Sequence, residues 1–155
     1  MATEIERKFL VNNPPFQEWG EGTQLKQGYL ARGAEATARV RVAGSKGYLT
    51  IKGKTIGISR LEYEYEIPLT EAEALLSICE GGIIVKKRWK VPVGGHIWEV
   101  DIFEGENSGL VLAEIELEHE EESFNRPSWL GDEVSDDSRY FNGALSQYPF
   151  SKWDT

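Results

Sequence analysis

Residues 3–11 read TEIERKFLV, and the orientation of this stretch decides the fold. In a β-strand successive side chains point to opposite faces, so Glu4, Glu6 and Lys8 share one face and the apolar residues share the other. An ordinary half-buried strand would bury the apolar face and leave the three charges in water. The charge pattern of the remaining strands tells which face is inside.

Composition limits the class of protein. The 155 residues fit a single domain over 1–155, and a net charge of -9 disfavours a nucleic-acid partner, because phosphate backbones require a basic footprint. The single cysteine, Cys79, cannot form an internal disulfide, which favours a reducing cytoplasm. The sequence begins with no apolar run or basic leader, so we expect neither secretion nor a membrane partner.

Short alternating segments predict about eight β-strands. Glycine-containing stretches such as RGAE at 32–35 and VGGH at 93–96 separate them, and such tight turns join antiparallel neighbours. A sheet of this size avoids exposed edges by closing, so we expect a closed antiparallel barrel. The predicted strands cover 3–11, 24–31, 37–43, 47–53, 60–67, 83–91, 96–103 and 111–118.

Two helices complete the predicted α+β, mainly β, fold. TEAEALLSIC at 70–79 carries a capping box formed by Thr70 and Glu73. SDDSRYFNGALSQY at 135–148 predicts a second helix with Ser135 as its N-cap. The stretch 123–134 between the last strand and this helix is expected to be a loop.

Most of the predicted strands carry charges of one sign on one face. Solvated faces usually mix signs, because like charges on neighbouring strands repel by about 0.2–1 kcal/mol per pair. Segregated rows are instead typical of the walls of a site. The acidic rows lie at 62–66, 99–101 and 114–118, and the basic rows lie at 39–41, 52–54 and 86–90.

An inverted barrel accounts for these rows. Its charged faces would line a central tunnel with a charged lumen, and its apolar faces would point outward, where short helices pack against them. An apolar face that the helices leave uncovered would also allow a homodimer. Charges in such a lumen are tolerated only with compensating charges, water, metal ions or a ligand.

The lumen would suit a polyanion together with divalent cations. Arginine and lysine bind phosphate oxygens, whereas carboxylates alone would repel them. Carboxylates that hold Mg²⁺ or Mn²⁺ beside the phosphates resolve this conflict, and the combination is typical of phosphoryl transfer. His96 and His119 stand alone in the sequence and predict no metal cluster.

The ordered set of charge motifs resembles that of the CYTH family, the triphosphate tunnel metalloenzymes. The resemblance extends over nearly the whole chain and implies an eight-stranded antiparallel tunnel. It rests on EIERKF at 4–9, RVR at 39–41, TIK at 50–52, EYEYE at 62–66, KKR at 86–88, EVD at 99–101 and EIE at 114–116.

The resemblance also implies roles for individual residues. The implied metal ligands are Glu4, Glu6, Glu62, Glu64, Asp101, Glu114 and Glu116. The implied phosphate-binding residues are Lys8, Arg39, Arg41, Lys52, Lys86 and Arg88. The implied catalytic group is Glu62, Glu64, Asp101 and Lys86.

The function implied by the resemblance is metal-dependent hydrolysis of inorganic triphosphate to pyrophosphate and phosphate, with two Mg²⁺ or Mn²⁺ ions. Family members as short as this chain, without a second domain, look more like the bacterial inorganic triphosphatases. The alternatives are a class IV adenylyl cyclase or a nucleoside or thiamine triphosphatase. A third alternative, a non-catalytic sensor of polyphosphate, would leave the acidic rows without a purpose.

Overall fold

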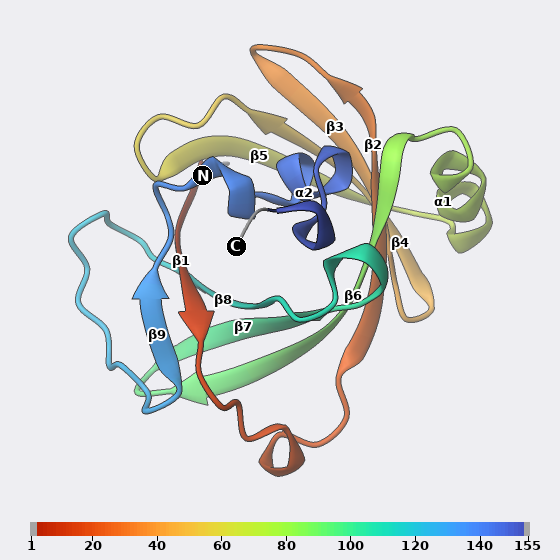
Figure 1. The fold of residues 1–155 in the computed structure, drawn as a ribbon. Coiled ribbons are helices and arrows are strands. Elements are labelled where there is room, and N and C mark those ends of the chain that lie inside the picture. The colour runs from red at the N-terminus through yellow and green to blue at the C-terminus, as the bar shows by residue number, and fades with distance from the viewer. Residues whose placement is uncertain (1–2, 154–155) are drawn as a thin grey trace.

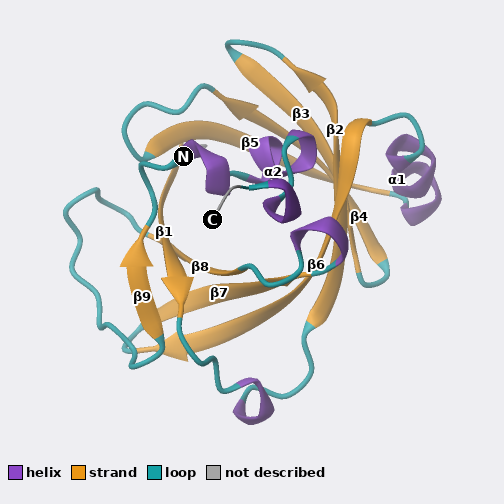
Figure 2. Ribbon diagram, viewed as in Figure 1, coloured by secondary structure: helices purple, strands orange, loops and turns teal. Residues whose placement is uncertain are grey.

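Antiparallel strands build most of the structure, a computed structural model that describes residues 3–153 (Figures 1 and 2). The strands are β1 (Thr3–Val11), β2 (Thr23–Arg32), β3 (Ala36–Ala43), β4 (Lys46–Gly53), β5 (Ser59–Ile67), β6 (Glu80–Val93), β7 (His96–Phe103), β8 (Val111–Glu116) and β9 (Leu130–Glu133). The helices are α1 (Leu69–Leu76) and α2 (Asn142–Gln147), with 3₁₀ turns η1 (Phe16–Glu18), η2 (Gly105–Asn107), η3 (Ser138–Tyr140) and η4 (Phe150–Lys152).

Strands β1 to β8 close into the predicted barrel. Their order is β5-β4-β3-β2-β6-β7-β8-β1, and β1 then pairs with β5, with Thr3 opposite Leu61 and Ile5 opposite Ser59. Every strand pair is antiparallel, as the short turns predicted. The strand that begins the chain is therefore the one that closes the barrel.

The ninth strand corrects the prediction of a loop over 123–134. In β9, Leu130 pairs with Val11 and Glu133 pairs with Phe9. The pairing of β1 with β5 ends at Ile5, so the later part of β1 keeps a free edge on that side. The four residues of β9 supply hydrogen-bond partners along this edge.

The apolar face of β1 belongs to a core that includes residues outside the barrel strands. Phe9 and Trp98 are fully buried there with Val100 of β7. Trp129 and Phe124, from the segment between β8 and β9, pack against these side chains. The segments between strands thus cover part of the outer apolar face of the sheet, which leaves the alternate, charged positions for the interior.

Helix α1 packs against the outside of the barrel, as predicted. It contacts β2, β3 and β4, and Gly47 is needed because a β-carbon there would overlap with Ala72. The predicted capping box is wrong, since α1 begins directly after Pro68 and no side chain caps it. Thr70 therefore lies inside the first turn rather than before it.

The single helix predicted over 135–148 is divided into η3 and α2. Asp137 accepts a 3.1 Å hydrogen bond from the backbone N–H of Arg139, which caps η3, and Phe141 is extended. Ser135 does not cap a helix, because its hydroxyl accepts the backbone N–H of Lys8 at 2.9 Å. Short polar side chains that bond locally favour such turns over a continuous helix.

Helix α2 lies inside one end of the barrel, which differs from the prediction that the short helices pack outside (Figure 1). Leu145 is buried against Ile84, Phe103 and Leu112. Each of these three residues lies two positions from a charged residue of the same strand, such as Lys86 on β6, so they share the inward face. Apolar inward positions at this end require an apolar partner, and α2 supplies it.

The outer face of β5 stays partly uncovered. Leu61, Tyr63 and Tyr65 are 53%, 48% and 56% exposed. A single chain does not test the homodimer that such a face would allow, so the homodimer stays a prediction. Within residues 3–153, no helix has the length and apolar character required to cross a membrane.

Candidate active site

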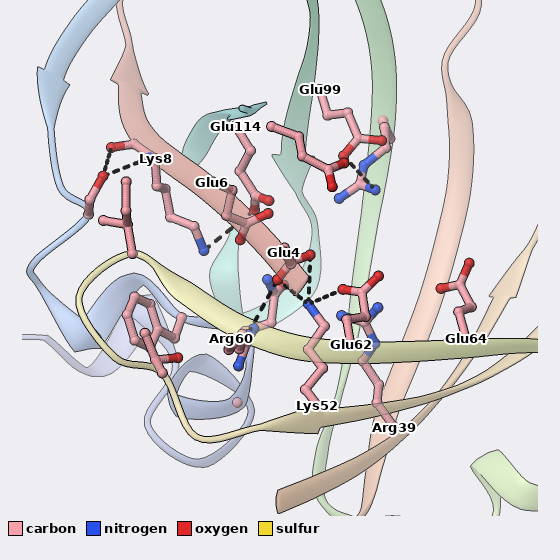
Figure 3. Close-up of a pocket in the computed structure, with 18 of the residues that line it drawn as sticks. Glu4, Glu6, Lys8, Arg39, Lys52, Arg60, Glu62, Glu64, Glu99 and Glu114 are labelled. Atoms are coloured by element: carbon pink, nitrogen blue, oxygen red, sulfur yellow. Dashed lines mark hydrogen bonds and ion pairs between the residues drawn. The ribbon is translucent and has the colours of Figure 1, made fainter. Parts of the chain in front are cut away.

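All eight barrel strands contribute side chains to one cavity of about 860 Å³. Figure 3 shows acidic and basic side chains of several strands pointing toward one another across it. Nine carboxylates and eight basic side chains line the cavity. The acids are Glu4, Glu6, Glu62, Glu64, Glu99, Glu114, Glu116, Glu118 and Glu122, and the bases are Lys8, Arg39, Arg41, Lys52, Arg60, Lys86, Arg88 and Lys90.

The structure brings together every predicted site residue except Asp101 along this cavity. Asp101 does not line the cavity, because Lys86 and Arg88 cover its side chain, which is only 2% exposed. Its two oxygens accept hydrogen bonds from Arg88 at 2.7 and 2.9 Å. The second oxygen also lies 2.8 Å from the Lys86 ammonium nitrogen.

The first group of charges joins β1, β4 and β5. The ammonium nitrogen of Lys52 lies 3.3 Å from Glu4 and 3.2 Å from Glu62, and Arg60 lies 3.3 Å from Glu4 (Figure 3). Burial and the hydrogen bond with Glu4 raise the pKa of Glu62 to about 7. Burial also acts to raise the pKa of Glu4, but the hydrogen bond with Glu62 and the nearby cations outweigh it, so that this pKa is lowered. The two carboxylates therefore share one proton near neutral pH.

A second pair of carboxylates lies farther along β1. Burial and the charge of Glu114 raise the pKa of Glu6 well above the ordinary carboxyl value. Burial opposes ionisation of Glu114 too, but Lys8, Arg88 and Lys86 outweigh it and hold its pKa well below the ordinary value. Lys8 lies 3.4 Å from Glu114. Within this pair Glu6 therefore keeps its proton to a higher pH than Glu114 does.

Two arginines of β3 present unsatisfied donors. Arg39 is buried in the cavity wall, and its Nε has no hydrogen-bond partner among the residues that the structure describes. Nε of Arg41 is also buried and has no hydrogen-bond partner among residues 3–153. Another nitrogen of Arg41, Nη2, lies 3.4 Å from a carboxylate oxygen of Glu64. Buried donors without partners are costly, whereas the guanidinium groups of both arginines line the cavity.

The carboxylates form pairs rather than a complete metal cage. Among residues 3–153, no group of three or more His, Cys, Asp and Glu side chains is arranged to hold a metal ion. Mg²⁺ in particular is commonly held by one or two carboxylates, with phosphate oxygens and water as its other ligands. The pairs Glu4 with Glu62 and Glu6 with Glu114 fit this mode of binding.

Arg60 and Asn142 are two of the cavity residues that sequence reasoning missed. Arg60 lies on the same face as Glu62 and precedes it by two positions, so extending the alternation backward would have found it. Asn142 approaches from α2, and its side-chain oxygen accepts a 2.9 Å hydrogen bond from Lys86. Nothing local to 135–148 indicates this contact, because it depends on α2 lying inside the barrel.

His96 lines the cavity and belongs to no metal-binding group among residues 3–153. Its Nε2 lies 2.5 Å from a carboxylate oxygen of Glu122. This contact ties the segment after β8 to the start of β7.

We expect the metal-free protein to lose stability as the pH rises through about 7. The folded-state pKa of Glu62, about 7, exceeds the ordinary value of 4.5, so the folded state holds this proton more tightly than the unfolded state. The resulting stabilisation is complete below about pH 4.5 and is lost as the pH rises through about 7. Thermal unfolding in a chelator should give a lower Tm at about pH 8.5 than at about pH 5.5.

The variant Glu62→Gln should remove much of this difference in Tm. Glu66→Gln is the matched control, since Glu66 is exposed on the same strand and lies outside the cavity lining. A difference in Tm that is the same in Glu62→Gln as in the parent would contradict the assignment.

Comparison with known proteins places the chain in a family. The model of the CYTH domain matches residues 2–145. The chain is 47% identical over 154 residues to an inorganic triphosphatase of Acetivibrio thermocellus, with 99% of both proteins covered. It is 40% identical over 149 residues to an inorganic triphosphatase of Nitrosomonas europaea, covering 93% of this chain and 97% of that one.

A solved structure agrees with these matches. The crystal structure of an inorganic triphosphatase superposes with a TM-score of 0.67 at 37% identity, over 94% of this chain and 95% of that chain. The barrel, the charge motifs and the match over nearly the whole sequence lead to one conclusion: the chain belongs to the CYTH domain family.

Proposed function

We propose that the protein hydrolyses inorganic triphosphate to pyrophosphate and phosphate with the help of divalent cations. The observation that carries this proposal is the cavity lined by eight basic and nine acidic side chains. A polyanion alone would be repelled by the carboxylates, and a cation alone would be repelled by the bases. A phosphate chain with bound divalent cations complements both sets. Two relatives that match nearly the full chain are named inorganic triphosphatases, which supports this substrate.

The basic side chains bind the phosphates. Arg39 and Arg41 line the cavity and offer their guanidinium groups to phosphate oxygens, for which the forked geometry of arginine is suited. The ammonium groups add positive charge from the other walls of the barrel. The full set is Lys8, Arg39, Arg41, Lys52, Lys86 and Arg88.

The carboxylates bind the cations, which we take to be two Mg²⁺ or Mn²⁺ ions. The residues that would hold them are Glu4, Glu6, Glu62, Glu64, Glu114 and Glu116. Bound there, the ions would neutralise charge on the phosphate oxygens and make water more acidic. A proton shared by Glu4 and Glu62, or one kept by Glu6, would leave when cations bind.

Hydrolysis requires water to attack a terminal phosphorus in line with the bridging oxygen. A new phosphorus–oxygen bond forms while the bridging bond breaks, and pyrophosphate leaves with the electron pair. Glu62, with a pKa of about 7, accepts the proton from the water. Glu64, which accepts a 3.0 Å hydrogen bond from Thr50, helps to orient that water, and Lys86 stabilises charge on the phosphate chain.

The deciding experiment measures phosphate release from inorganic triphosphate, ATP and thiamine triphosphate, each with Mg²⁺, Mn²⁺ or no metal, together with formation of cyclic AMP. We expect metal-dependent release with inorganic triphosphate as the preferred substrate. Preference for ATP, preference for thiamine triphosphate, or cyclic AMP formation would assign the site to the corresponding other reaction. Absence of turnover of all three substrates would overturn the proposal of an enzyme.

Arg39→Gln should raise the KM for triphosphate by about 10-fold or more, because a charge-assisted hydrogen bond contributes about 1.5–3 kcal/mol. We expect a smaller effect on kcat, since Arg39 binds the chain rather than the attacking water. Initial-rate kinetics at saturating metal would measure both constants. A KM equal to that of the parent would remove Arg39 from the phosphate site.

A further inference from the structure

Asp101 differs from every other predicted carboxylate of the site in what its oxygens contact. One oxygen accepts Nε of Arg88 at 2.7 Å, and the other lies 2.9 Å from Nη2 of Arg88 and 2.8 Å from Nζ of Lys86. Asp101 does not belong to the cavity lining, whereas Arg88 and Lys86 do. Its carboxylate therefore contacts Lys86 and Arg88, and these two cations separate it from the cavity that they line.

This arrangement leaves little room at the Asp101 oxygens for a metal ion to bind. The Asp101 side chain is 2% exposed, and three donors already occupy its two oxygens. An ion that bound there would have to displace a guanidinium or an ammonium group and bring a further positive charge next to them. Contact with water or substrate is prevented by the same burial.

The two cations need Asp101 because they lie on the same face of β6, two residues apart. Without a carboxylate between them, Lys86 and Arg88 would repel each other in a buried setting. Lys86 is 1% exposed, and its ammonium is otherwise held by the side-chain oxygen of Asn142 at 2.9 Å. An arginine has five N–H donors; Asp101 engages Nε and Nη2 of Arg88, and Glu99 lies 3.3 Å from Nη1, so N–H groups on Nη1 and Nη2 remain for phosphate oxygens.

We propose that Asp101 is a positioning residue that holds Lys86 and Arg88 side by side, charged and turned toward the phosphate chain. This inference rests on the proposed triphosphate site and changes the role that the sequence motif alone suggests for Asp101. The aspartate acts through the two cations and touches neither the metal ions nor the reacting atoms.

The test compares Asp101→Asn with the matched control Asp132→Asn, an exposed aspartate of β9. We expect Asp101→Asn to weaken the binding of inorganic triphosphate by about 10-fold or more, as loss of a charge-assisted contact would. Calorimetry at saturating Mg²⁺, with a triphosphate analogue whose bridging oxygens are replaced by non-hydrolysable groups, measures this affinity independently of turnover. Binding of Mn²⁺ alone, measured in the same way, should stay equal to that of the parent and of Asp132→Asn. A large loss of Mn²⁺ affinity with unchanged triphosphate affinity would overturn the inference and make Asp101 a metal ligand.

A double-mutant cycle adds a readout that general damage to the fold would not produce. Lys86→Met combined with Asp101→Asn removes one positive and one negative charge, so the double variant avoids an unpaired buried charge at Lys86. If Asp101 acts through Lys86, the loss of triphosphate affinity in the double variant should be clearly smaller than the product of the two single losses. Strictly multiplicative losses would contradict the inference. Failure of the parent protein to hydrolyse triphosphate would instead refute the proposed function, and the binding measurements would still report on Asp101.

Discussion

Removal of divalent cations with a chelator is expected to abolish phosphate release from inorganic triphosphate, and excess Mg²⁺ or Mn²⁺ should restore it. Nine carboxylates line the cavity, and they repel a polyanion unless cations intervene. Charge neutralisation by such groups contributes about 10²-fold or more to phosphoryl and acyl transfer, so the expected loss is at least of this size. Phosphate release in metal-free buffer, followed by titration with each cation, measures the effect.

The control for the chelation experiment is a measurement that the protein stays folded without the ions. Circular dichroism before and after removal of the ions should be unchanged, because the barrel is closed by backbone pairing between β1 and β5 and not by the carboxylates. Full activity in the presence of the chelator, with metal content verified, would contradict the metal-dependent mechanism.

Glu6→Gln is expected to lower phosphate release by about 100-fold or more while the barrel stays folded. Glu6 lies opposite Glu116 in the register of β1 and β8, and it hydrogen bonds to Glu114. A glutamine keeps the shape and can still donate to Glu114, but its neutral amide attracts a cation far less. The loss should therefore appear in the rate at normal metal concentration and be partly relieved by excess metal.

The matched control is Arg7→Gln, the next residue on β1. Arg7 points to the outer side, where it forms a 2.6 Å ion pair with Glu133, and it does not line the cavity. Its loss should leave the rate of hydrolysis unchanged. Activity of Glu6→Gln equal to that of Arg7→Gln would remove the first strand from the metal site.

The faces of the strands could be predicted from the sequence because alternation is a local property of the backbone. In β1 the spacing of Glu4, Glu6 and Lys8 is enough to put them on one face, whatever lies around the strand. Rows of one sign on successive strands then indicate that this face lines a site. The cavity lining agrees with this reasoning for all the predicted residues except Asp101.

Local sequence patterns predicted the structure of residues 135–148 less well than that of the strands. The sequence over 135–148 has the composition of one helix, yet it forms a 3₁₀ turn and a short helix inside the barrel. The apolar positions Ile84, Phe103 and Leu112 on otherwise charged faces require a partner, but they do not say which segment provides it. Only the folded chain brings Leu145 to them.

By itself, then, the sequence determined the eight barrel strands, their inward faces and the sign of the charges in each row, because each follows from spacing along one segment. The tertiary structure decided which charges meet. Arg60 reaches Glu4 only because β5 pairs with β1 across the closure of the barrel. Asp101 is hidden because Lys86 and Arg88 on the neighbouring strand cover both of its oxygens. Contacts of this kind depend on strand register and on packing around the whole barrel, and no local pattern contains them.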